Sequence, residues 1–143
     1  MSLADEAEIL KLIHRAAHAF DSAQFDEFAS IFARATTNIG GLAAPIVGAD
    51  GVRAFVRDRL ILHRGKPRTQ HRISNTVITV DETARTAAAT SYVLVIQGLD
   101  GVITPILAGR YNDTFASEGA GWYFTSRTGS DGMVGDLSRH LRP

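Results

Sequence analysis

The feature that most constrains the fold is the second half of the sequence, which from residue 69 onward reads as strands separated by short turns. Residues 69–81 alternate between apolar and polar side chains, as expected for a strand with one buried face. Residues 84–97 are rich in Thr, Val, Ile and Tyr, and Asp100-Gly101 is a strong signal for a two-residue hairpin turn. Further strands are expected over residues 102–116 and 122–128. The sequence therefore predicts an antiparallel meander.

The first half of the sequence predicts three helices. Residues 3–20 place Ile9, Ile13 and Phe20 on one face at helical spacing, with charged residues opposite. Shorter helices are expected over residues 25–32 and from an N-cap at Asp50 to about His63, and residues 36–48 have the small, turn-rich character of short irregular strands. Helices followed by a meander indicate an α+β fold with the helices on one face of the sheet. A curled sheet closed by helices encloses a concave, mostly apolar pocket of the kind that binds ligands.

Length, charge and composition narrow the classes of function. The 143 residues fit one domain spanning residues 1–143, and the 15 basic residues cancel the 15 acidic ones, so nothing electrostatic favours nucleic acid as a partner. The absence of cysteine excludes a disulfide framework and a thiolate metal site, and it suits a reducing cytosol. The acidic first residues do not resemble a secretory signal, and no apolar run approaches the roughly 20 residues of a membrane helix. We therefore expect a cytoplasmic domain with no membrane segment.

His71 is the strongest candidate for chemistry, because histidine is the side-chain type whose ordinary pKa lies near physiological pH. The alternation predicts that it shares a strand face with Ile73 and Val77. Asp21, at the end of the first helix, is the natural partner, since a carboxylate on one ring nitrogen fixes the tautomer and lets the other nitrogen act as a general base. The alternatives are that Asp21 caps the helix or forms a turn, and that His71 is a polar residue at the rim.

Short motifs occur along the chain in a recognisable order. They are Phe20-Asp21 followed by Phe25-Asp26; Gly48-x-x-Gly51-Val52-Arg53-x-Phe55; Thr69-Gln70-His71 with Asn75; Gly109-Arg110-Tyr111-x-Asp113-x-Phe115; and Gly121-Trp122-Tyr123-Phe124 with Arg127. Together these motifs resemble the SnoaL-like branch of the nuclear transport factor 2-like (NTF2-like) superfamily over nearly the whole chain. The resemblance implies a cone-shaped α+β barrel, in which a curved, mostly antiparallel sheet and three helices enclose a pocket. It also implies a homodimer, because members usually pair through the outer face of the sheet.

The resemblance also suggests a class of reaction. Members include scytalone dehydratase, hexachlorocyclohexane dehydrochlorinase, ketosteroid isomerase, polyketide cyclases and epoxide hydrolases, and also proteins that only bind partners. The positions of His71 and Asp21 are most similar to those of the dehydratase and the dehydrochlorinase, where a histidine backed by an aspartate removes a proton during an elimination. This implies a lyase or isomerase, of dehydratase or dehydrohalogenase type, that needs no cofactor and acts on a small apolar or aromatic ring compound. Three features depart from those enzymes. Arg15 is the only charged residue where the dehydrochlorinase has a lysine, and Phe20 replaces a tyrosine that precedes the dehydratase's aspartate. The expected strands also hold no second histidine, which the dehydratase has on its pocket wall.

Other side chains are candidates to bind substrate on the pocket wall. Asn75 shares the face of His71 by simple alternation, and the others lie on later strands or at the end of the first helix: Tyr92, Arg110, Tyr111, Arg127 and Phe20. An arginine here would bind an anionic group or balance the charge of a leaving group, and a tyrosine would donate a proton. Parity leaves open which face of the later strands turns inward, so each of these strand residues also fits a cross-strand pair or an outward-facing position.

Three alternatives to a histidine-based enzyme remain at this point. His14 and His18 lie one helical turn apart, but they fall on the charged face and lack an evident third ligand, so we expect no metal. An epoxide hydrolase would need an Asp-Arg-Asp relay, for which Asp113 and Arg110 are candidates. The main alternative is a non-catalytic domain that binds a small molecule or assembles with other subunits. A carboxylate of Asp21 within hydrogen-bond reach of His71 inside a closed pocket would favour the enzyme.

Overall fold

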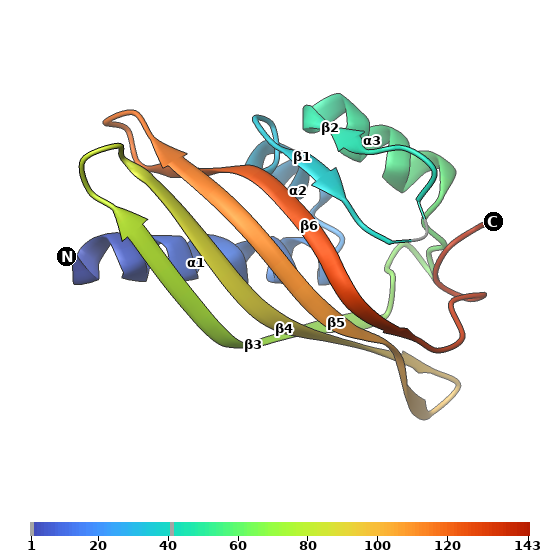
Figure 1. Ribbon diagram of the computed structural model, residues 1–143. Helices are drawn as coiled ribbons and strands as arrows, with labels where there is room; N and C mark the ends of the chain where they lie inside the picture. The colour runs from blue at the N-terminus through green and yellow to red at the C-terminus, as the bar shows by residue number, and fades with distance from the viewer. Residues whose placement is uncertain (1, 41) are drawn as a thin grey trace.

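The computed structural model describes residues 2–40 and 42–143 and forms one sheet covered by helices (Figure 1). The helices are α1 (Leu3–Asp21), α2 (Phe25–Ile31) and α3 (Gly48–Asp58). The strands are β1 (Thr36–Asn38), β2 (Ile46–Val47), β3 (Thr69–Asp81), β4 (Thr86–Leu99), β5 (Val102–Ser117) and β6 (Trp122–Val134). The strand order is β2-β1-β6-β5-β4-β3, and every neighbouring pair is antiparallel except β1 with β6. The predicted α+β class and the meander from β3 to β6 are confirmed.

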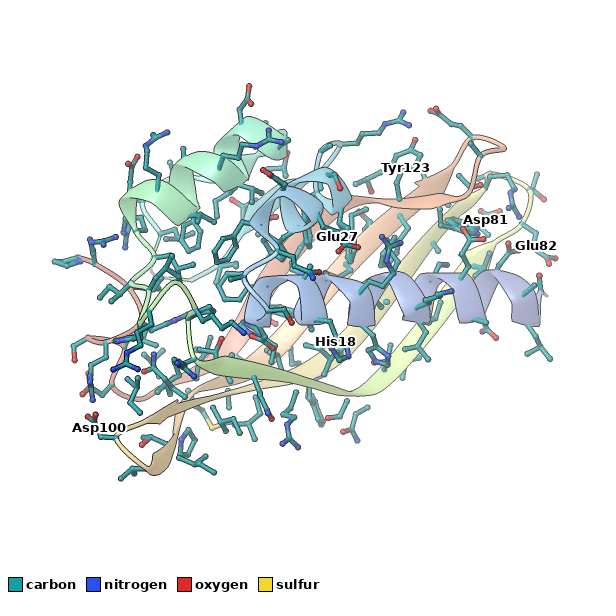
Figure 2. The ribbon with its side chains drawn as sticks, turned by 180° about the vertical axis from the view of Figure 1, so that it is seen from behind. His18, Glu27, Asp81, Glu82, Asp100 and Tyr123 are labelled. Atoms are coloured by element: carbon teal, nitrogen blue, oxygen red, sulfur yellow. The ribbon has the colours of Figure 1, made fainter. Side chains whose placement is uncertain are left out.

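Helices α1 and α2 lie against the same face of the sheet, as Figure 2 shows from behind. The side chain of Ser2 caps α1 by accepting a hydrogen bond from the backbone N–H of Asp5, and the apolar stripe predicted for this helix is buried. The core between the helices and the sheet is aromatic. The ring of Phe32 stacks on Phe124 at 4.6 Å, and Phe115 packs on the other side of the same core. The helices are thereby fixed to the middle of the sheet, which sets the end of α1 relative to β3.

Helix α3 begins and ends earlier than predicted. It starts at Gly48, whose φ of +64° suits glycine, so Asp50 lies in the first turn and is not the N-cap. The helix stops at Asp58 because the next residues leave it to pair with the C-terminal segment, where Leu60 forms a bridge with Leu141. The predicted continuation to His63 is wrong, since that residue forms a tight turn with Lys66. The bridge between Leu60 and Leu141 joins segments far apart in sequence, so no local sequence pattern predicts where α3 ends.

A bulge in β3 reverses the alternation on which part of the sequence analysis relied. The register with β4 shifts between Ser74 and Val77, and Asn75 adopts a φ of +54°, a left-handed conformation that asparagine tolerates. Before the bulge, His71 and Ile73 face the helices. After it, Thr76 faces inward and hydrogen-bonds Ser91, while Val77 is 67% exposed on the outer face. The prediction that Val77 shares the face of His71 is therefore wrong.

The hairpin between β4 and β5 forms as predicted. Asp100 and Gly101 have φ values of +54° and +76°, as a two-residue turn between twisted strands requires. Figure 2 shows Asp100 at the tip of this hairpin. Strand β6 extends to Val134, beyond the predicted end at residue 128, because its far half continues to pair with β5. The longer strand brings the C-terminal segment back towards the end of α3 (Figure 1).

Candidate active site

The end of α1 and the start of β3 are joined by one carboxylate. Asp21, the last residue of α1, accepts three hydrogen bonds: from the Thr69 hydroxyl at 2.8 Å, from the backbone N–H of His71 at 2.7 Å, and from Nδ1 of His71 at 2.7 Å. Both side chains of the Asp21–His71 pair are largely buried. Because Asp21 holds the strand backbone as well as the imidazole, the ring position is fixed relative to the sheet. The two residues singled out from the sequence are thus in direct contact.

The hydrogen bonds determine the tautomer of His71. An ionised carboxylate only accepts hydrogen bonds, so the Nδ1 atom that contacts Asp21 carries the proton. In the neutral imidazole the lone pair is then on Nε2. The ring is held from a second side by Phe20, which meets it edge to face with centroids 4.9 Å apart. In that tautomer the oriented ring presents Nε2 as a proton acceptor.

His71 lies on the wall of a cavity of about 320 Å³. The wall is mostly apolar and is built from α1, α2, the sheet and the C-terminal segment, with aromatic rings from Phe20, Phe28 and Phe32. Few polar side chains interrupt it, among them Thr37, His71, Tyr111, Arg127 and His140. A volume of this size with a few polar groups suits a small ring compound. Phe20, Tyr111 and Arg127 all line this cavity, and their role in binding a substrate stays a prediction.

Arg127 is paired inside the protein. Its Nε and one terminal nitrogen donate to the two carboxylate oxygens of Asp113 at 2.8 and 3.0 Å, and both side chains are almost fully buried. The guanidinium lies 4.0 Å above the ring of Tyr111. Burial raises the pKa of Tyr111 above its ordinary value. The phenol at the cavity wall therefore stays protonated at neutral pH and is suited to donate a hydrogen bond.

His140 is a cavity residue that the sequence analysis left unassigned. It lies in the segment after β6, is only 8% exposed, and its ring is T-shaped to that of Phe20, with centroids 6.1 Å apart. Its Nδ1 is buried and has no hydrogen-bond partner among the described residues. Burial, aided by the nearby His71, lowers the pKa of His140 to about 4, so its imidazole is neutral at physiological pH. The short, irregular stretch around it carries no periodicity that would have predicted its burial.

Three predicted pocket residues lie elsewhere. Asn75 is exposed in the bulge of β3, which turns it away from the face of His71. Tyr92 and Arg110 are opposite one another on β4 and β5, and both point to the outer face, where the guanidinium contacts the tyrosine ring and Asp131. These three side chains do not line the cavity, contrary to prediction. The same placement separates Arg110 from Asp113, so the relay considered for an epoxide hydrolase does not form between them.

The histidines of α1 do not line this cavity, but both line an open groove between α1 and β3 that Asp21 and His71 also line. His14 and His18 are exposed, and Figure 2 shows His18 on the side of α1 next to β3. Among residues 2–40 and 42–143, no three His, Cys, Asp or Glu side chains are grouped as metal ligands. Over the same residues, no helix combines the length and apolar character needed to cross a membrane.

Known proteins with a similar sequence or fold were found by comparison with family models and solved structures. The family model described as the SnoaL-like domain matches residues 1–128. A comparison with curated proteins finds no match. Among solved structures, an NTF2-like protein with a cystatin-like fold from Novosphingobium aromaticivorans superposes with a TM-score of 0.76 at 20% identity, covering 89% of this chain and 81% of that chain.

Two further structures from the same organism cover almost the whole chain. One is provisionally named an aromatic ring hydroxylase, with a TM-score of 0.75, 24% identity, and coverage of 97% of this chain and 98% of that chain. The other is provisionally named a scytalone dehydratase, with a TM-score of 0.70, 19% identity, and coverage of 99% and 93%. Identities this low show a common fold and nothing more.

Proposed function

The chain belongs to the SnoaL-like domain family, and we propose that it is a lyase or isomerase that removes a proton from carbon in a small ring compound without a cofactor. The observation that carries this proposal is the contact between Asp21 and Nδ1 of His71 at the wall of an apolar cavity. A binding protein needs no oriented imidazole, whereas a general base does. The structural neighbour provisionally named a scytalone dehydratase is consistent with an elimination.

The chemistry follows from the tautomer. Nε2 of His71 takes a proton from a ring carbon, and the resulting imidazolium is stabilised by the carboxylate of Asp21. The electron pair left on carbon either forms a double bond and expels a leaving group, or moves onto a neighbouring carbonyl oxygen as an enolate. The protonated phenol of Tyr111 is placed on the same cavity wall to donate a hydrogen bond to the developing negative charge. Aromatic side chains hold the ring.

Deuterium exchange tests the step that these reactions share. We expect the protein to accelerate the exchange of α-protons of 1-indanone and 1-tetralone in buffered D₂O, followed by NMR. His71→Gln is expected to reduce the protein-dependent rate by about 10²- to 10⁴-fold, the usual contribution of a general base. His14→Gln, a histidine on the exposed face of α1, is the matched control and should exchange like the unmodified protein. Equal rates for the unmodified protein and His71→Gln with every ketone would instead support the non-catalytic binding domain.

We also propose that the protein is a homodimer, as the family resemblance implies. The outer face of β4 and β5 carries exposed Tyr92 and Leu94 together with the polar side chains of Arg110 and Asn112. Such a mixed surface suits an interface between two copies. Light scattering should give twice the mass of the 15.4 kDa chain, and Leu94→Asp should shift that mass to the monomer. A monomeric mass for the unmodified protein would contradict the proposal.

A further inference from the structure

The backbone of the C-terminal segment is held in place by hydrogen bonds on both sides of His140. The backbone N–H and carbonyl of His140 are both used, in bonds to Leu137 and Ile61 of 2.9 Å each. The carbonyl of the preceding residue, Arg139, accepts from the side chain of Gln97 and contacts His63. On the other side, the N–H of Arg142 donates to the carbonyl of Arg59 at 2.7 Å. These bonds fix the backbone from which the imidazole extends, and the buried side chain lines the cavity.

The imidazole itself makes no such bonds. Its Nδ1 is buried and unpartnered among the described residues, although a buried polar group without a partner costs about 1–3 kcal/mol. Native proteins satisfy nearly all such groups, and an exception points to a functional role or to a partner outside the chain. His140 lines the same cavity as His71, and both rings make a T-shaped arrangement with Phe20. The Nδ1 atom is closed off even from the cavity, so a ligand there would reach the ring at its other nitrogen, Nε2, which has no hydrogen-bond partner among the described residues.

We propose that His140 is a second ligand-binding residue, which hydrogen-bonds an uncharged oxygen on the ring compound, a hydroxyl or a carbonyl. A neutral imidazole can accept from a hydroxyl or donate to a carbonyl, depending on its tautomer. The low pKa of His140 disfavours a charged imidazolium and hence strong attraction of an anion. The inference rests on the proposed function, because it assigns to the same cavity a substrate class: oxygen-substituted rings rather than plain hydrocarbons or halogenated rings.

Binding of paired probes tests this assignment without any turnover. 2-Naphthol and naphthalene have the same ring system and differ in one hydroxyl group. We expect the protein to bind 2-naphthol more tightly, as measured by fluorescence or NMR titration. His140→Phe should weaken 2-naphthol binding about tenfold, a typical loss for one buried hydrogen bond, and leave naphthalene binding within about twofold. His140→Gln, which restores a hydrogen-bonding side chain, should recover part of the 2-naphthol affinity. Thermal unfolding of each variant verifies that it is folded.

The outcomes separate the two proposals. Equal loss of both ligands in His140→Phe would mean that the residue only shapes the cavity, and it would overturn the inference. So would a protein that binds 2-naphthol no more tightly than naphthalene. His71→Gln should keep its preference for 2-naphthol even though it loses deuterium exchange. If exchange is absent in the unmodified protein but the selective effect of His140→Phe persists, the catalytic proposal fails and the oxygen-binding role of His140 stands.

Discussion

Replacing Asp21 with asparagine is expected to slow proton removal by about 10³- to 10⁴-fold, because the amide favours the wrong tautomer of His71. Asp21 now accepts from the ring Nδ1 and from the backbone N–H of His71. An asparagine has one accepting oxygen, which the backbone N–H retains, so its NH₂ group is left to face the ring. That group can only donate, and Nδ1 must then become the acceptor. The proton moves to Nε2, and the base is lost while the geometry is kept.

The tautomer can be observed directly. In the unmodified protein, ¹⁵N NMR of the histidine rings should show the His71 proton on Nδ1, and in Asp21→Asn it should appear on Nε2. Thr69→Val is the matched control, because it removes one hydrogen bond from the same carboxylate and leaves the contact with the imidazole in place. We expect that control to lose less than about tenfold in exchange rate, because the carboxylate still accepts from Nδ1 and the tautomer of His71 is unchanged. An Asp21→Asn protein that exchanges the ring ketones within tenfold of the unmodified rate would refute the assigned role.

Local sequence patterns predict most of the helices and strands of the fold. The apolar spacing of α1 and the alternation at the start of β3 each reflect burial of one face, and that burial is what the sequence records. The contact of Asp21 with His71 was suggested by the order of motifs. Its geometry depends on the packing of α1 over β3, which no local pattern specifies.

The failures have physical causes of two kinds. The prediction that Asn75 shares the face of His71 is wrong because one extra residue in the bulge of β3 inverts the alternation of side chains. A pattern of period two in the sequence does not show where such a bulge lies. Tyr92 and Arg110 belong to strands whose parity was open, and they pair with each other on the outer face. His140 was missed because its burial results from long-range bonds between the C-terminal segment and the residues after α3. Each failure concerns which side chains face the cavity, so substrate specificity is the property least readable from the sequence.

Removing the carboxylate of Asp113 is expected to have the largest effect on stability. In Asp113→Leu the guanidinium of Arg127 would stay buried with no anion to accept its two hydrogen bonds. Breaking a buried pair from one side typically costs about 3–5 kcal/mol in the free energy of unfolding. The rings of Phe32, Tyr111 and Phe124 lie 5.3, 4.0 and 5.1 Å from the guanidinium, so its other near neighbours include no carboxylate to replace Asp113. Urea denaturation measures the loss.

A double variant tests whether the ion pair of Asp113 and Arg127 adds to the free energy of unfolding. Asp113→Leu combined with Arg127→Met removes both charges and fills the site with apolar atoms, so we expect it to be more stable than either single variant. The exposed pair of Arg15 and Glu27 is the control: at 3.0 Å its distance is similar, yet Glu27→Gln should cost less than about 1 kcal/mol. Single-variant losses that simply add in the double variant would show that the two charges do not stabilise each other. A double variant about as stable as the unmodified protein would instead mean that the pair's main role is positional, since it fixes the guanidinium over Tyr111 and so holds that phenol at the cavity wall.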